Sequence, residues 1–321
     1  MPNIRNPRSG SMQFWPRKRS KRVYARVKSW AKVKDAKLLG FAGYKVGMTH
    51  AIIIDNKQKS ITKGQEISCP ITVIECPPLK SASIRFYKKT IDGLKVVSEI
   101  FAENLDKELK RKIIMPKSVK KKIEDIKEYD DITLLVYTQP KLTGIGRKKP
   151  EIFEIGLGGN KEDKLKFAQE KLGKEIPITE VFEPGQQMDI HAVTTGKGFQ
   201  GPVKRFGISL RQKKSEKSVR NPGSLGGWSA QGHVMYRVAH AGKMGYHKRT
   251  DYNKILLQIN DKPEEVNRKG GFGKYGLVKN TYILVSGSVA GPKKRIIRFN
   301  TAIRPNKNMP NEAPTISYLS K

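Results

Sequence analysis

Residues 194 to 251 read TTGKGFQGPVKRFGISLRQKKSEKSVRNPGSLGGWSAQGHVMYRVAHAGKMGYHKRTD, and this glycine-rich stretch decides how the rest of the chain is organised. Between Gly196 and Arg249 it holds twelve Lys or Arg and one acid, Glu216. Its apolar residues occur singly, so it has no helical or strand face with which to build a core. Such a segment cannot offset its ordering entropy by apolar burial. We interpret it as a loop that a polyanion orders, and we expect that polyanion to be RNA.

The net charge of the chain is very high. Its 321 residues include 64 Lys and Arg against 29 Asp and Glu, a formal charge of +35 with a pI near 10.1. Self-repulsion on this scale destabilises an isolated compact protein, which indicates a permanent anionic partner. Acidic lipid is the alternative polyanion, but the sequence contains no run of 18 apolar residues and no basic amphipathic helix. The first twenty residues also lack the apolar core of a signal peptide. We expect no membrane partner.

The charge is distributed unevenly. Residues 1–40 hold twelve Lys or Arg and one acid, Asp35. Residues 80–180 hold 17 acids beside 23 bases, which is close to ordinary soluble composition. A near-neutral segment inside a strongly basic chain indicates an insertion that faces solvent while the rest contacts RNA. Residues 1–36 read as an extended arm in which cations alternate with Phe14, Trp15, Tyr24 and Trp30. That mixture suits irregular RNA, and a disordered tail or a localisation signal is the alternative.

The remaining pattern is mainly that of strands. β-branched and apolar runs bounded by Gly, Pro or polar clusters predict strands over 38–55, 69–78, 81–89, 94–102, 130–140, 178–182, 188–195, 253–259, 280–291 and 294–300. Residues 160–173 predict the clearest helix, with Asn160 as N-cap, Leu165, Ala168 and Leu172 on one face, and Gly173 at its end. Two further short helical candidates cover 107–114 and 118–126.

The fold that we predict is mainly β with an α+β insertion. Strands on both sides of the insertion and of the basic loop can share one sheet, and closing it into a barrel would remove its edges. We divide the chain into a basic N-terminal arm (1–36), a β-barrel body (37–79 and 176–321) interrupted by the long basic loop 196–250, and an inserted α/β subdomain (80–175).

A glycine motif at 196–201 matches G-x-G-x-x-G and follows a predicted strand. A dinucleotide site needs a helix that begins at the third glycine and an acid about 20 residues further on. Pro202 follows instead, with no apolar helical period, and Glu216 lies among lysines. We interpret the glycines as points where the backbone approaches a phosphodiester chain closely.

Neither the cysteines nor the histidines predict a metal site. Cys69 and Cys76 form a lone C-x6-C pair without the further ligands of a closed zinc site, and we expect both to be reduced core thiols. His233, His240 and His247 recur every seven residues, but the glycines between them argue against a helix. We assign them to RNA contact or to ordinary loop positions. No catalytic arrangement of Ser, His, Asp or Cys is recognisable, and we expect no cofactor.

Several motifs resemble those of a known family. Phe182, Asp189, Ala192, Thr194, Gly196-Lys197-Gly198, Gly201 and Arg205 have the spacing of the signature of large-subunit ribosomal protein three. PRKR near the start, GYKVGMTH at 43–50, PGSLGGW at 222–228 and AGKMGYHKRT at 241–250 are similar to its archaeal and eukaryotic branch, as is the insertion. The modest length is most similar to that of archaeal members.

The resemblance implies a translation-protein-type closed β-barrel with an inserted α/β subdomain, bound to large-subunit rRNA in the cytoplasmic ribosome. It also implies an arm and a central loop that run through the rRNA, with the loop tip and its Trp228 near the peptidyl transferase centre, and a role in early assembly. Neighbouring large-subunit ribosomal proteins are further implied partners. We expect a structural protein, with no enzymatic activity and no small-molecule substrate.

The residues that we expect to bind RNA are cations and rings of the arm and the loop. They are Arg17, Lys18, Arg19, Arg22, Lys197, Phe199, Lys204, Arg205, Arg211, Lys213, Lys214, Arg220, Trp228, Arg237, His240, Lys243, His247, Lys248 and Arg249. Two other classes of protein are alternatives. An RNA-modifying enzyme would need a cofactor pocket or a nucleophile with its base, and a chromatin-type binder would need a helix that reads a groove.

Overall fold

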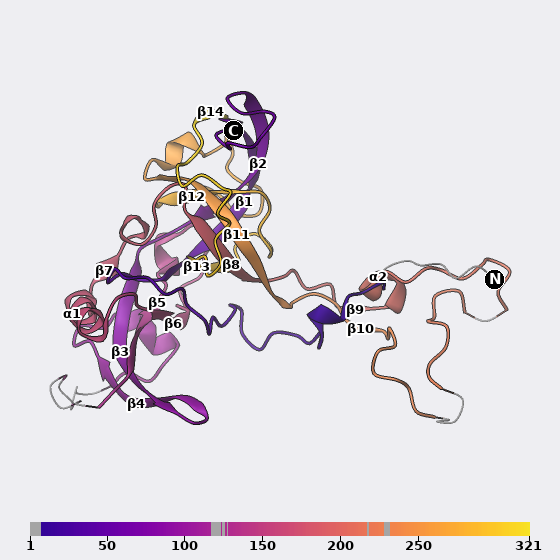
Figure 1. Ribbon diagram of the computed structural model, residues 1–321, viewed down its shortest axis with the longest axis horizontal. Helices are drawn as coiled ribbons and strands as arrows, with labels where there is room; N and C mark the ends of the chain where they lie inside the picture. The colour runs from indigo at the N-terminus through magenta and orange to yellow at the C-terminus, as the bar shows by residue number, and fades with distance from the viewer. Residues whose placement is uncertain (1–7, 117–122, 124–125, 127, 217, 228–231) are drawn as a thin grey trace. The chain divides into compact units, whose positions relative to one another are not determined.

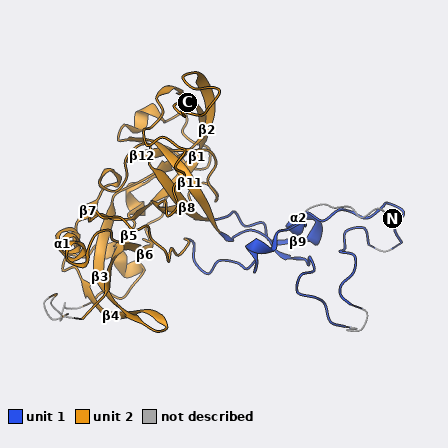
Figure 2. Cartoon of the chain, in the orientation of Figure 1, with its two compact units in different colours: residues 1–23, 193–248 blue, residues 24–192, 249–321 orange. Residues whose placement is uncertain are grey.

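The computed structural model describes residues 8–116, 123, 126, 128–216, 218–227 and 232–321. The chain forms two compact units (Figure 2). Unit 1 consists of residues 1–23 and 193–248, and unit 2 consists of residues 24–192 and 249–321. The fold is mainly β, as predicted, with few helices. The stretch expected to be one arm, residues 1–36, is divided between the two units after Val23.

The larger sheet of unit 2 has seven strands (Figure 1). They are β1 (Gly40–Ile54), β2 (Glu66–Glu75), β8 (Gln187–Val193), β11 (Lys248–Asn260), β12 (Tyr282–Ser286), β13 (Ile296–Thr301) and β14 (Ile316–Leu319), in the order β13-β8-β11-β12-β2-β1-β14. The long strand β1 changes partner along its length on one side. Its first part, from Gly40 to Tyr44, pairs with β13, and Ala51–Ile53 pairs with β14.

Strand β1 approaches its neighbours very closely at Gly43. A Cβ there would lie 2.7 Å from the Cys76 sulfur and 2.7 Å from the Glu75 carbonyl oxygen, so only glycine fits. The register of β1 against β2 shifts between Lys45 and Gly47, which marks a bulge. Cys76 is buried and its burial raises the pKa of its thiol, as expected of a core cysteine. Cys69 is not a core thiol, because β2 leaves it half-buried next to the Ser286 hydroxyl.

The second sheet of unit 2 lies between residues 79 and 176. Its main path is β4 (Gly93–Phe101), β3 (Leu79–Thr90), β5 (Asp131–Tyr137) and β6 (Ile152–Gly156), and β7 (Glu175–Ile176) pairs with β3. The 3-10 helices η2 (Lys107–Arg111) and η4 (Pro140–Leu142) and the helix α1 (Lys161–Lys171) belong to the same part of the chain. Its ion pairs include Arg85 with Glu99 and Glu154, and Lys164 with Asp131.

The predicted helix is confirmed with two differences. Helix α1 begins after Asn160, but the Asn160 side chain makes no capping hydrogen bond, and Leu172 is the C-cap residue outside the helix. Ala168 is buried as predicted. The candidate at 107–114 is only the 3-10 helix η2, and most of the candidate at 118–126 lies outside the described residues.

Most predicted strands are present, and one is wrong. Residues 178–180 form a 3-10 helix, η5 (Ile178–Glu180), because Pro177 precedes them and Ile178 turns inward to be buried. Five strands of the described residues were missed, namely β6, β14 and three two-residue strands, β7, β9 (Phe199–Gln200) and β10 (Gly242–Lys243). Two further 3-10 helices, η1 (Met12–Phe14) and η6 (Pro263–Glu265), lie in loops.

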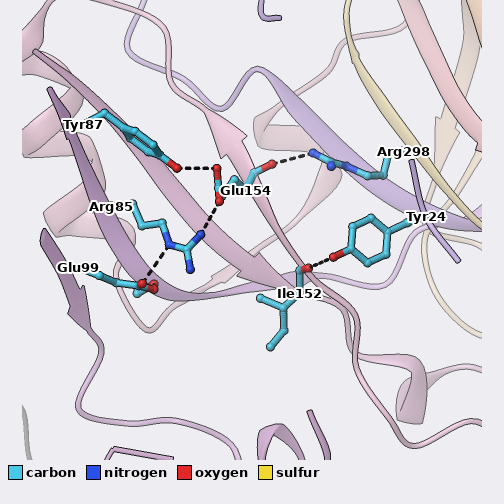
Figure 3. A network of polar contacts seen from close by, with 8 residues as sticks. Tyr24, Arg85, Tyr87, Glu99, Ile152, Glu154 and Arg298 are labelled. Atoms are coloured by element: carbon cyan, nitrogen blue, oxygen red, sulfur yellow. Dashed lines mark hydrogen bonds and ion pairs between the residues drawn. The ribbon is translucent and has the colours of Figure 1, made fainter. Parts of the chain in front are cut away.

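A buried arginine connects β13 with Ala25 of the predicted arm and with β6 (Figure 3). Arg298 is 3% exposed, and its guanidinium donates to the carbonyl oxygens of Ala25 (3.2 Å) and Glu154 (2.7 Å). It lies 4.3 Å from the centre of the Phe153 ring. Burial lowers the pKa of Arg298 to about 9. Beside it, the Tyr24 hydroxyl donates to the Ile152 carbonyl at 2.7 Å, so residues 24–25 are fastened to the second sheet.

A buried carboxylate at the end of β2 organises the loop before β12. Glu75 is fully buried, and its Oε1 accepts from the backbone N–H groups of Lys279 (2.9 Å) and Asn280 (3.0 Å) and from the Asn280 side chain (2.7 Å). Its Oε2 accepts from the Tyr275 hydroxyl. Burial and this carboxylate together raise the pKa of Tyr275. Four donors therefore depend on one side chain.

Replacing Glu75 should destabilise unit 2 strongly. Glu75→Ala leaves these buried donors without an acceptor, and we expect it to lower the free energy of unfolding by about 3–5 kcal/mol. Glu75→Gln keeps an acceptor oxygen and should cost about 1 kcal/mol. The measurement is urea unfolding of the full chain followed by circular dichroism. The exposed Glu66 of the same strand is the control, since Glu66→Gln should stay within about 0.5 kcal/mol of the wild type. Equal stability of Glu75→Ala and Glu66→Gln would contradict this account.

Candidate nucleic-acid interface

Unit 1 is built from the arm and the basic loop together. From the sequence, the arm (1–36) and the loop (196–250) are predicted as separate segments, whereas residues 8–23 and 193–248 form a single compact unit. Two short strands, β9 (Phe199–Gln200) and β10 (Gly242–Lys243), pair across the base of the loop. The pairing continues beyond them, because Lys197 N–H donates to the Met244 carbonyl and Met244 N–H to that of Gly198. A single-turn helix, α2 (Pro202–Phe206), follows β9.

Arg205 holds three segments of unit 1 together. Its guanidinium donates to the carbonyl oxygens of His240 (3.0 Å), Lys243 (3.2 Å) and Arg17 (3.3 Å). Arg17 reciprocates with a hydrogen bond of 2.9 Å to the Arg205 carbonyl. Partial burial lowers the pKa of Arg205. A Cβ at Gly242 would lie 2.8 Å from this guanidinium, so the side chain of Arg205 depends on a glycine at that position.

Phe206 is the small apolar centre of the same arrangement. The guanidinium carbons of Arg17 and Arg205 lie 4.4 and 5.0 Å from the centre of its ring, a cation–π geometry. The Trp15 ring packs at 5.7 Å between centroids. Gly10 lies so close that a Cβ would come within 2.6 Å of the Phe206 ring. Phe206 is 6% exposed, so arm residues bury it against the loop.

A second connection joins the arm to the end of the loop. Ser20 N–H donates to the Tyr246 carbonyl at 2.8 Å, and His247 Nδ1 lies 2.9 Å from the Lys18 carbonyl oxygen. A carbonyl only accepts, so Nδ1 carries the proton. The Arg19 guanidinium lies 5.0 Å from the centre of the Tyr246 ring. His247 is buried, and its backbone N–H donates to Thr194 Oγ1.

The predicted binding residues differ in their positions. One group lies where the arm meets the loop, namely Arg17, Lys18, Arg19, Arg205, His240, Lys243 and His247. A second group is exposed on the loop, namely Lys197, Phe199, Lys204, Lys213, Lys214, Arg220, Arg237 and Lys248. Arg22 is exposed on the arm, and Arg211 and Arg249 are half-buried. Trp228 lies outside the described residues. The arm contact of Arg8 and the packing of Trp15 on Phe206 were missed, because single apolar residues in two distant basic segments give no pattern that pairs them.

The glycine motif at 196–201 differs from the expectation in one respect. A helix does begin directly after Gly201, which was not predicted. It has five residues and ends at Gly207 in the left-handed conformation, and Pro202 at its first turn lacks an N–H. The preceding strand is the two-residue β9, paired only with β10 in the described structure. The arrangement therefore lacks the parallel sheet and long helix of a dinucleotide fold.

The signature residues divide between the two units. Phe182 is buried against Phe299, and Asp189 is buried and accepts from the backbone N–H groups of Asn253 (3.0 Å) and Ile303 (3.1 Å). Thr194 and Arg205 organise unit 1. Among the described residues, no cluster of His, Cys, Asp or Glu has the arrangement of a metal site. No described helix is both long and apolar enough to cross a bilayer.

The fold and this surface define a class, namely a basic, mainly β protein whose arm and loop carry exposed cations on one compact unit. The comparisons identify the family. Residues 1–320 match the family described as Ribosomal protein L3, and the chain belongs to it, which confirms the resemblance seen in the sequence. Members are structural components, and the chain is not an enzyme.

Archaeal relatives cover nearly the whole chain. The Large ribosomal subunit protein uL3 of Methanobrevibacter smithii is 48% identical over 98% of this chain and 96% of its own length. Those of Archaeoglobus fulgidus and Methanocaldococcus jannaschii are 46% and 45% identical, over 94% and 99% of this chain and 93% and 97% of their own lengths.

Arg205→Lys should open unit 1 although it keeps the charge. A lysine ammonium lacks the planar fork that reaches three carbonyl groups, and losing two such bonds costs about 2 kcal/mol. Limited proteolysis of the full chain should then cut residues 8–20 and 199–247 about 10- to 30-fold faster. Lys204→Ala, which removes the neighbouring exposed cation, is the control and should cleave at the wild-type rate. If Arg205→Lys were as resistant as the wild type, charge rather than hydrogen-bond geometry would hold the unit.

Proposed function

We propose that this protein is a structural constituent of the large ribosomal subunit that binds rRNA through unit 1. The observation that carries the proposal is how its arginines are held. Arg8, Arg17, Arg205 and Arg211 each donate to backbone carbonyl oxygens of unit 1, which fixes their positions without neutralising their charge. Fixed positive charges on an irregular surface suit the phosphates of a folded RNA.

The finer parts of the proposal follow from the family. The six strands β13-β8-β11-β12-β2-β1 act as a closed translation-protein-type barrel, supported by the additional pairing of β13 with β1. The chain is divided into four functional parts, namely the barrel body (37–79 and 176–321), the inserted subdomain (80–175), the arm (1–36) and the loop (196–250). The loop extends towards the peptidyl transferase centre, neighbouring ribosomal proteins cover part of the body, and binding supports early assembly.

Binding to large-subunit rRNA should depend steeply on salt. If about 8 phosphates are neutralised, the logarithm of the binding constant should fall with that of the salt concentration with a slope of about −6 to −7. Lys214→Gln should reduce the slope by about 0.7–0.9, since it removes one exposed loop cation. Lys110→Gln is the control and should leave the slope unchanged, since Lys110 is an exposed cation on η2, in the second sheet's part of the chain. A slope near zero for the wild type would contradict binding through charge.

Trp228 should matter for function more than for assembly. Stacking of one indole on a base contributes about 1–3 kcal/mol, which is small beside the phosphate contacts of a whole protein. Trp228→Ala should therefore enter large subunits at nearly the wild-type level but change their sensitivity to drugs that bind the peptidyl transferase centre. Incorporation is measured by sedimentation in high salt, and Arg205→Ala, which should reduce incorporation, is the comparison. A lower melting temperature of the RNA-free Trp228→Ala protein, with unchanged drug sensitivity, would instead place the indole in the protein's own packing.

A further inference from the structure

A groove lies inside unit 1 where the arm meets the far part of the loop. Its cavity volume is about 490 Å³, within the range of small-molecule sites. Four stretches line it, namely residues 8–9 of the arm, residues 208, 209 and 211 after α2, and two strips of the loop at 221–224 and 237–239. The groove therefore exists only when arm and loop are joined.

The groove combines apolar side chains with cations. Ile208, Pro222 and Val238 are half-buried in its lining, and Ala239 is 9% exposed. Apolar side chains and a proline ring give a surface against which the flat face of an aromatic ring can lie. A phosphate alone would gain nothing from such a surface.

Two of the three arginines of the groove, Arg8 and Arg211, are positioned by backbone oxygens. Arg8 Nη2 donates to the Arg237 carbonyl at 2.6 Å, and Arg211 Nη2 donates to the Pro222 carbonyl at 3.0 Å. Among the described residues, the Arg237 guanidinium makes one weak contact, of 3.9 Å, with the Met235 sulfur. A guanidinium has five N–H donors, so a single carbonyl bond orients it and leaves donors for a phosphate.

Polar side chains complete the lining. Asn221 and Ser209 are exposed there and offer both donors and acceptors. Such groups can bond the edge of a base that has left its stack, as proteins do with irregular RNA. Gly223 adds no side chain to the lining, and an ideal Cβ there meets no atom within 4 Å in the described part of the chain.

We propose that this groove binds one unstacked nucleotide of an RNA strand, with the base against Ile208, Pro222 and Ala239 and its phosphate on Arg8 and Arg237. The inference rests on the proposed rRNA binding and adds a base-dependent component to it. The arm and the loop then contact one base at a shared site, in addition to their charge interactions with RNA phosphates. An acidic peptide would also satisfy the arginines, but it has no ring for the apolar part of the groove.

The test compares RNA with and without a base. The full chain is titrated with a fluorescent single-stranded RNA of about 12 nucleotides, and with the same RNA carrying an abasic residue at a chosen position. The position is chosen by photo-crosslinking with 4-thiouridine, which should label residues 208–209 or 221–224. We expect the complete RNA to bind about 5- to 100-fold more tightly than the abasic one.

Two variants attribute this preference to the groove. Gly223→Leu adds a side chain to the lining, and Arg237→Gln removes one cation while it keeps the carbonyl that Arg8 uses. Both should bring the ratio of the two affinities close to one. Arg220→Gln removes an equal charge from an exposed loop residue outside the lining, so it should weaken both RNAs and leave the ratio unchanged.

The outcomes separate this inference from the proposed function. A wild-type ratio of one, or a ratio that Gly223→Leu does not change, overturns the nucleotide groove. Crosslinks confined to residues outside the groove also overturn it. Large-subunit rRNA is titrated in parallel, and a wild-type chain that failed to bind it would overturn the proposed function instead. Tighter binding of a poly-glutamate peptide than of the RNA, at equal charge, would assign the groove to an acidic peptide and overturn the inference.

Discussion

Hydrogen bonds from cationic side chains to main-chain carbonyl oxygens are the interaction on which the irregular parts of this protein depend. Arg205 binds three such oxygens in unit 1, and Arg298 binds two in unit 2. Lys45 does the same with the carbonyls of Val289 and Gly291. In a loop that lacks the regular hydrogen bonds of a sheet, backbone carbonyl oxygens need other donors. A guanidinium can donate to several of them at once. The charge survives, because a carbonyl is neutral.

In the second sheet of unit 2, cations form ion pairs with carboxylates. Arg85 pairs with Glu99 at 3.0 Å and also with Glu154, and Lys80 pairs with Asp106 at 2.9 Å. These contacts cancel charge as well as fixing geometry. The same side-chain types therefore serve two purposes in one chain. Between residues 80 and 180, acids are numerous enough to pair with many of the cations. Unit 1 has few acids, so the positive charge of its cations is not cancelled within the chain.

The sequence predicts those parts of the fold whose determinants are local. Alternating β-branched residues predicted β8 and β13, and capping residues predicted both ends of α1 to within a residue. The strand β14 was missed because four residues without a flanking pattern gain their structure from pairing with β1. The candidate site was predicted as a set of cations, but its geometry was not. Nothing local indicates that Trp15 meets Phe206 across some 190 positions of sequence, since that contact is tertiary.

The joining of arm and loop changes how binding energy can be used. A loop that orders only on contact loses part of its interaction energy to ordering entropy. Here Arg17 and Arg205 hold each other's backbone and share the Phe206 ring, so part of that order exists within the protein. Two guanidinium groups on one ring also repel each other, and a phosphate bound there would relieve that repulsion. Under the proposed RNA binding, a phosphate on this surface would therefore strengthen the contacts of Arg17 and Arg205 that hold the arm against the loop.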